Sequence, residues 1–292
     1  MRTAANLRRE LSARNLVRAA QLPHEQSCSN SPSVVFRADE AGKTHGNFLD
    51  ASFRRIQANP AWASRLSKVY TASRNLARQY DGPLTRERSR HRELDCAHSS
   101  DALLMNIFCY PGLLARSAAQ GLLGLTHAVQ PEFGVRIGVP LHPPRAKRSV
   151  EFGIMDICPD RTEIDCRVAD LLIEAKLTET GFQTAPARLV SRYLDLEEVF
   201  DLNELPRHAN GAFLSYQLIR GVLAAHTHHC RFAVLADARR PDLLEHWFRV
   251  IRAVRSFALR SRLQILTWQE LSTVTPPRVQ AFLASKYGIV RC

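Results

Sequence analysis

A strand-length apolar run that carries two charged residues constrains this chain more than any other feature. Residues 171–177 read Leu-Leu-Ile-Glu-Ala-Lys-Leu, which has the length and composition of a buried β-strand. Because successive side chains of a strand point to opposite faces, Glu174 and Lys176 share one face, and the intervening Ile173 and Ala175 share the other. The segment therefore predicts a strand in a covered sheet, with an acid and a base side by side on it.

A second acid precedes this run. If Ala169 and Asp170 form a two-residue turn, the chain folds back as a hairpin and Asp165 lies opposite Glu174, with Cβ atoms about 5 Å apart. Two carboxylates at that distance repel unless a cation lies between them, and Mg²⁺ is a hard cation that takes oxygen ligands. The carbonyl of Ala175 is a further oxygen. The predicted metal ligands, for Mg²⁺ or Mn²⁺, are therefore Asp165, Glu174 and Ala175.

Lys176 is expected to reach the same point. Its compact, hydrated ammonium is suited to hold an attacking water or to stabilise charge on a phosphate. Lysine is scarce in this chain: only five of the 40 Lys and Arg residues are lysines. A lysine in this strand is therefore less expected to be a residue without a specific role. The alternative is a half-exposed hairpin whose polar face holds an ordinary Asp, Glu and Lys, and spacing alone leaves both open.

The pattern of Asp165 followed by Glu-Ala-Lys at 174–176 resembles the core of the PD-(D/E)XK nuclease superfamily, although an isoleucine precedes the aspartate where the superfamily name has proline. Residues 92–108 and 214–219 are similar to uncharacterised bacterial restriction-endonuclease-like proteins of that superfamily, and the resemblance covers residues 45–289. It implies an α/β fold with a restriction-endonuclease-like core, a central mixed sheet flanked by helices, and a helical N-terminal addition.

The activity that this resemblance implies is metal-dependent hydrolysis of phosphodiester bonds in DNA, as an endonuclease or exonuclease. The alternative is a catalytically inactive nucleic-acid-binding protein of the same fold. In the superfamily a polar residue on the helix after the second hairpin strand often orders the site, so Gln217 joins the catalytic candidates. Glu93 and Glu132 are candidates for an accessory acid, and Gln183 lies where active-site mouths occur. Each of these has the alternative of being a solvated surface residue.

The charge balance indicates a polyanionic partner. The formal net charge is +12, and phosphate contacts dominate affinity for nucleic acids. Candidate DNA-binding residues are Arg145, Lys147 and Arg148, in a basic Pro-rich loop, and Arg188 and Arg192, which are spaced i, i+4 in a predicted helix. The alternative is that genome composition inflates the arginine content.

Composition divides the chain into three expected parts. Residues 1–45, Arg-rich and then rich in Ser, Pro, Asn and Gly, are expected to be a disordered basic extension and linker. Residues 46–112 form a helical region, and residues 113–292 form the nuclease-like domain. The N-terminal composition is also similar to that of a transit peptide or of a basic helix that binds DNA. An extension without a function is a further alternative.

Cysteine usage favours a reducing compartment. The seven cysteines are scattered without a Cys-x-x-Cys pair, which predicts free thiols and a cytoplasmic location. No apolar run of about 18 residues is present, so neither a transmembrane helix nor a membrane partner is expected. The sequence is compatible with a homodimer but does not require one.

Hydrophobic periodicity predicts the remaining elements. The predicted helices span residues 48–79, 102–110, 113–129, 186–200, 213–226, 241–259 and 268–273, and the predicted strands outside the hairpin span residues 133–141, 232–237 and 263–267.

Overall fold

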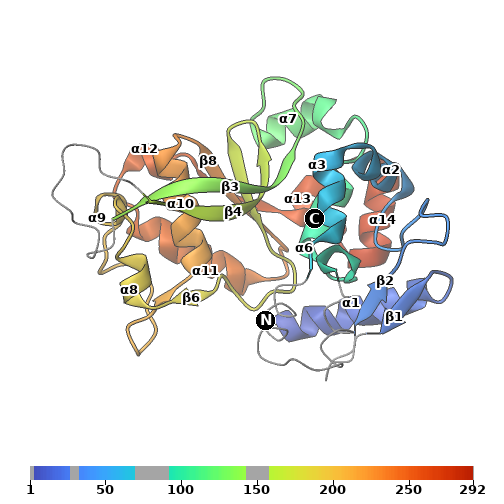
Figure 1. Ribbon diagram of the computed structural model, residues 1–292, viewed down its shortest axis with the longest axis horizontal. Coiled ribbons are helices and arrows are strands. Elements are labelled where there is room, and N and C mark those ends of the chain that lie inside the picture. The colour runs from blue at the N-terminus through green and yellow to red at the C-terminus, as the bar shows by residue number, and fades with distance from the viewer. Residues whose placement is uncertain (1–2, 27–32, 70–91, 143–157, 292) are drawn as a thin grey trace.

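The computed structural model describes residues 3–26, 33–69, 92–142 and 158–291, and a five-stranded mixed sheet lies at its centre (Figure 1). The strands run in the order β3-β4-β5-β8-β9, with antiparallel pairing from β3 to β5 and parallel pairing from β5 to β9. The predicted α/β class is confirmed. The strands are β3 (Glu132–Leu141), β4 (Cys158–Val168), β5 (Leu171–Ala175), β8 (Arg231–Ala236) and β9 (Leu263–Thr267).

Helices cover both faces of this sheet, as parallel pairing requires. Alternate residues of β5 face opposite layers, so Leu172 belongs to one apolar core and Ile173 to the other. The Leu172 face is covered by α8 (Ala187–Val190), α9 (Leu196–Val199), α10 (Tyr216–Thr227), α11 (Pro241–Ala253) and α12 (Phe257–Arg260). The Ile173 face is covered by α1 (Ala4–Ala19), α6 (Ser100–Phe108), α7 (Ser117–Leu123), α13 (Trp268–Thr273) and α14 (Pro277–Tyr287).

The hairpin between β4 and β5 has the predicted register. Cys166 pairs with Ile173, and Val168 pairs with Leu171. Ala169 takes the left-handed conformation, with φ of 54°, in the turn between the two strands. The carboxylate of the turn residue Asp170 accepts two hydrogen bonds from Arg231, of 2.8 and 2.7 Å, which lower its pKa. The turn therefore ties the hairpin to the neighbouring strand β8.

β4 changes direction at Asp165. The residues on either side of it, Ile164 and Cys166, would share a face in a regular strand, yet they belong to opposite cores. On β3 the residue at this level is Gly134, whose φ of 61° lies in the left-handed region. A Cβ at Gly134 would collide with the Arg65 guanidinium. Glycine thus permits both the backbone kink and the close approach of Arg65.

The expectation of disorder over residues 1–45 is wrong for α1. Leu7, Leu11 and Asn15, spaced four residues apart, are fully buried, and the two leucines share a core with β5. The many arginines of this segment led to the expectation of disorder, but the three residues recur with helical spacing and therefore lie on one side of α1. The domain boundaries at residues 45 and 112 stay predictions.

The rest of the N-terminal region consists of short elements. They are β1 (His24–Gln26), β2 (Val34–Phe36), α2 (Asp50–Ala58), α3 (Pro60–Ala63), the 3-10 turns η1 (Ser64–Ser67) and η2 (Glu93–Asp95), and, after α6, η3 (Leu113–Ala115). Of these, α2, η2 and η3 contact α6, and β2 contacts α1. The helix predicted for 48–79 is thus divided, and its part beyond residue 69 lies outside the described residues. The helix predicted for 113–129 is shorter, because α7 ends at Gly124 in the left-handed conformation.

The helix predicted for 186–200 is also divided, so the predicted shared face of Arg188 and Arg192 is wrong. Arg188 lies in α8, whereas Arg192 lies in the turn before α9. The physical cause is Tyr193, which is buried, forms a β-bridge to Leu141 and donates its hydroxyl to Asp160. These contacts pull the chain against β3 and end the helix.

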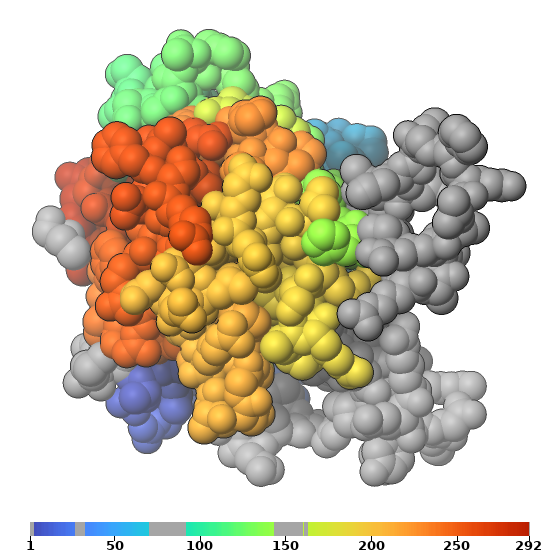
Figure 2. Space-filling view, turned by 90° about the vertical axis from the view of Figure 1, so that its left-hand side faces the viewer, coloured from blue at the N-terminus to red at the C-terminus, as the bar shows by residue number. Residues whose placement is uncertain are grey.

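The strand β9 and the helix α13 have the predicted bounds. The helix predicted for 213–226 begins later, as α10, because residues 213–214 form the strand β7 (Phe213–Leu214), which pairs with β6 (Thr184–Ala185). Seen from the left-hand side of Figure 1, the surface is formed largely by the chain after β5, coloured yellow to orange (Figure 2). Among the described residues no helix is long and apolar enough to cross a membrane.

Candidate active site

A groove of about 990 Å³ opens where β4 kinks and β5 ends. Its walls come from three parts of the chain that are distant in sequence. The sheet contributes Asp165 and Ala175, followed by Lys176; the N-terminal region contributes Arg8, Lys68, Glu93 and Asp101; and the chain after β5 contributes Gln183 and, in α10, Gln217. Acids and bases thus line one cavity, which is suited to a charged ligand.

Glu174 and Lys176 form a buried ion pair on the predicted common face of the strand. The Lys176 Nζ lies 2.7 Å from the Glu174 Oε1, and the two residues are 6% and 3% exposed. Burial favours the neutral amine, but Glu174, Asp165 and Glu179 outweigh it and raise the pKa of Lys176. The ammonium also lies 5.6 Å from the centre of the Phe182 ring. Lys176 is therefore a fixed positive charge at neutral pH.

Asp165 does not pair with Glu174 across the ladder, because the β4–β5 pairing ends at Cys166 and Ile173. Its Oδ2 instead accepts a hydrogen bond of 2.8 Å from the Ala175 backbone N–H. Burial, the charge of Glu174 and the charge of Asp101 raise the pKa of Asp165 well above its ordinary value. The charges of Glu174 and Asp101 thus repel the ionised Asp165, and a bound cation would relieve that repulsion.

The predicted ligand set fits a hard divalent cation. It offers two carboxylates and the backbone carbonyl of Ala175, a residue that lines the groove, and oxygen donors of this kind are those that Mg²⁺ selects. One oxygen of each carboxylate already accepts a hydrogen bond, Asp165 from Ala175 and Glu174 from Lys176. Within the described ranges no three His, Cys, Asp or Glu side chains gather as a metal site. A metal here would therefore need water or phosphate oxygens to complete its shell.

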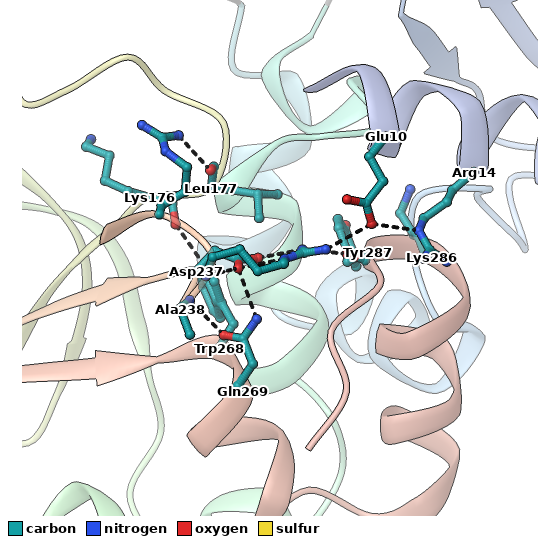
Figure 3. A network of polar contacts seen from close by, with 12 residues as sticks. Glu10, Arg14, Lys176, Leu177, Asp237, Ala238, Trp268, Gln269, Lys286 and Tyr287 are labelled. Carbon is teal, nitrogen blue, oxygen red and sulfur yellow. Dashed lines mark hydrogen bonds and ion pairs between the residues drawn. The ribbon is translucent and has the colours of Figure 1, made fainter. Parts of the chain in front are cut away.

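The backbone beyond Lys176 is held in place by side chains. Arg240, which is fully buried, donates to the carbonyls of Leu177 and Glu179 at 3.2 and 2.9 Å. The Glu179 carboxylate accepts from the Leu177 N–H and from the Ser100 hydroxyl, both at 2.6 Å. The carbonyl of Lys176 accepts from the Trp268 indole at 2.9 Å (Figure 3). These bonds orient the strand end that carries the site.

A second charge cluster forms the adjacent wall. The Lys68 Nζ lies 2.9 Å from carboxylate oxygens of both Glu93 and Glu163 and 3.6 Å from Asp101, and Arg65 pairs with Asp101 at 2.7 Å and with Glu163 at 2.9 Å. Although burial acts in the opposite direction, hydrogen bonds from Arg65 and Lys68 lower the pKa of Glu163 to about 2. Burial and then Asp101 raise the pKa of Glu93.

Sequence reasoning missed most of this wall. No functional role was assigned to Asp101, Lys68, Arg65 or Glu163 from the sequence. One signal was present, because the scarcity of lysine that singled out Lys176 applies equally to Lys68.

The structure brings three of the other predicted residues to the groove. Glu93, Gln183 and Gln217 line it. Gln217 lies in the first turn of α10, and its backbone N–H donates to the Phe182 carbonyl at 3.0 Å. This bond ties the start of α10 to the wall that contains Phe182.

Glu174, Glu132, Arg188 and Arg192 are not among the residues that line the groove. Glu132 is exposed at the start of β3 opposite Arg167, and Arg188 and Arg192 are exposed away from the cavity. Arg145, Lys147 and Arg148 lie outside the described residues.

Comparison with protein families gives a match over most of the chain. The family model described as "Restriction Endonuclease associating with ARP" matches residues 20–288. No curated protein matches the chain, and no solved structure matches it. The family match includes the whole sheet and the groove residues that come from it, whereas α1 lies before the matched range.

Proposed function

This chain belongs to the family of Restriction Endonucleases associating with ARP, and from that premise we propose that it is a metal-dependent nuclease that hydrolyses phosphodiester bonds in DNA. The observation that carries the proposal is the meeting of Asp165, Glu174 and Lys176 where β4 kinks and β5 ends, beside a groove of both charges. The same sheet, an antiparallel hairpin continued by parallel strands, supports placing the chain in the PD-(D/E)XK superfamily.

In this proposal Asp165, Glu174 and the Ala175 carbonyl hold Mg²⁺ or Mn²⁺. Such an ion, when bound, polarises the phosphate and makes water a stronger nucleophile at neutral pH. Asp165 is oriented for this role by the Ala175 N–H, and Glu174 by the Lys176 ammonium. Removing either orienting bond would leave a carboxylate free to turn away from the ion.

Lys176 has the second role in the proposal. Its ammonium, kept protonated by the surrounding acids, donates to the phosphate oxygen on which charge accumulates as the new bond forms. Because the residue is buried against Glu174 and Phe182, its position costs little reorganisation when the substrate binds. Gln217, at the first turn of α10, faces the same groove and is proposed to orient the substrate or the attacking water.

The test is cleavage of duplex DNA by the purified chain with Mg²⁺, with Mn²⁺ and with EDTA. Asp165→Asn keeps the shape of the side chain and an acceptor for the Ala175 N–H, yet it should lower the rate by about 10²-fold or more, as the loss of one transition-state contact typically does. Asp170→Asn is the matched control, since Asp170 lies in the turn at the other end of the same hairpin.

Full activity in EDTA, or equal rates for the two variants, would overturn the proposal. Metal-independent binding of DNA by the wild type, without cleavage under any of these conditions, would instead favour a catalytically inactive nucleic-acid-binding protein of the same fold.

A further inference from the structure

The first helix of the chain sends one arginine into the groove. Arg8 borders the cavity together with Lys68, Lys176 and Arg220, and its guanidinium donates to the carbonyl of Thr178 at 3.2 Å. Thr178 lies two residues after Lys176, so this bond places the Arg8 charge beside the end of β5. The next residue of α1, Arg9, is exposed and is not part of the groove.

The position of Arg8 is set by a rigid helix. Leu7, directly before it, is fully buried in the core that also contains β5 residues. Glu10, two residues later, pairs with Arg239 at 3.0 Å, and Arg239 in turn pairs at 2.6 Å with Asp237, a fully buried residue at the end of β8. Figure 3 shows this chain of contacts from Glu10 on α1 to Asp237 and onward to Gln269. Arg8 is therefore held between two anchored neighbours.

Arg8 differs from the other cations of the groove in its partners. Lys68 pairs with Glu93 and Glu163, Lys176 pairs with Glu174, and Arg220 pairs with Asp160 at 3.2 Å. Across the part of the chain that the structure describes, Arg8 has no ion pair, and its buried Nε has no hydrogen-bond partner. Guanidinium has five N–H donors, so most of the binding capacity of Arg8 is unused.

We infer that Arg8 binds a backbone phosphate of the DNA that enters the groove. Guanidinium matches the geometry of two phosphate oxygens. Because the groove also contains acidic groups, a polyanion that enters it needs a cation that is not already paired with one of them, and Arg8 is such a cation among the described residues. This inference rests on the proposed nuclease function for the identity of the ligand. It also gives α1, which precedes the range of the family match, a part in the site.

The test is binding of a duplex of about 20 base pairs in EDTA, where no cleavage occurs, measured over a range of salt concentrations. Arg8→Gln should weaken binding about tenfold at low salt and reduce the log–log salt slope by about 0.9, the value for one lost phosphate contact. Arg9→Gln removes the same charge one residue away and should change the affinity less than about twofold. Arg8→Lys should restore part of the affinity.

The outcomes separate this inference from the proposed function. Equal affinities and slopes for Arg8→Gln and Arg9→Gln would overturn the inference. The proposed nuclease activity would still be tested separately by the cleavage assay of the wild type. A selective loss in Arg8→Gln, with a wild type that cleaves nothing, would support the inference and reject catalysis. A wild type that binds no duplex even at low salt would overturn the inference. Melting temperatures of the variants show that α1 remains in place.

Discussion

The ammonium of Lys176, directly after β5, lies 2.7 Å from the carboxylate of Glu174, two residues earlier in the chain, and both are almost completely buried. Alternation along β5 makes this pairing possible, because it directs both side chains away from the core that receives Ile173 and Ala175. Each charge therefore stabilises the other in a place where either alone would be costly. The same two residues are the proposed metal ligand and the proposed phosphate-binding cation.

The pair should be strongly coupled in stability. Lys176→Met or Glu174→Gln alone leaves one buried charge without its partner and should lower the free energy of unfolding by about 3 kcal/mol or more. The double variant should lose much less than the sum of the two. Urea denaturation of the four proteins in EDTA measures this coupling.

The exposed pair Arg249–Glu245 on α11 is the matched control. Its side chains are about half exposed, at 52% and 56%, so its coupling energy should be below about 0.5 kcal/mol. Additive losses at Glu174 and Lys176, equal to those at the control pair, would show that the two buried charges do not depend on each other.

The metal should stabilise the wild type through Asp165. Repulsion from Glu174 and Asp101 disfavours the ionised Asp165, and a divalent ion that binds only the folded state raises stability, by about 2.7 kcal/mol at a hundredfold excess over its Kd. Millimolar Mg²⁺ should therefore raise the melting temperature of the wild type. Asp165→Asn relieves the repulsion, so it should be at least as stable as the wild type in EDTA and should gain little from Mg²⁺.

Asp170→Asn again serves as the control, and it should respond to Mg²⁺ as the wild type does. If the melting temperature of Asp165→Asn rises with Mg²⁺ as much as that of the wild type, the ion binds elsewhere on the protein.

A second buried lysine predicts a pH dependence of stability. Lys286 is fully buried, its Nζ donates to the Asn15 side chain at 2.7 Å and to the Ala97 carbonyl at 3.2 Å, and it lies over the rings of Phe36 and Tyr287. Burial, and then the charge of Arg18, lower the pKa of Lys286 well below its ordinary value, while Cys96 acts in the opposite direction.

The sign follows from proton binding. Between the lowered folded pKa and the unfolded value of about 10.4, the unfolded chain binds more protons than the folded one, so the free energy of unfolding rises with pH across that window. Urea denaturation between about pH 7 and pH 10 should show this rise in the wild type and a smaller one in Lys286→Met. Lys43→Met, which removes an exposed lysine, should keep the wild-type slope. A Lys286→Met slope equal to that of the wild type would contradict the prediction.

Local patterns were sufficient for the turn and the paired residues of the hairpin, but not for Asp165, which lies beyond the last pair of the ladder. Period-two alternation over residues 171–177 placed Glu174 and Lys176 on one face, and a two-residue turn at Ala169 and Asp170 set the register. Both depend on neighbouring residues alone, as do the bounds of β9 and α13, where an apolar strand meets a Thr267 capping box. The sequence by itself therefore determined the α/β class and the two partners of the buried ion pair.

Contacts between distant segments decided the rest of the site. Arg8, Lys68 and Asp101 come from segments far before the hairpin, and only tertiary packing, such as that of α1 and α6 on the sheet, brings them to its groove. Tertiary contacts also overrode local periodicity, since the bridge from Tyr193 to Leu141 ends the helix on which Arg188 and Arg192 were expected to share a face. A sequence pattern shows which face of a helix or strand is apolar. It does not show which other elements pack against that face, because all apolar faces must be buried together, and only the folded chain determines how.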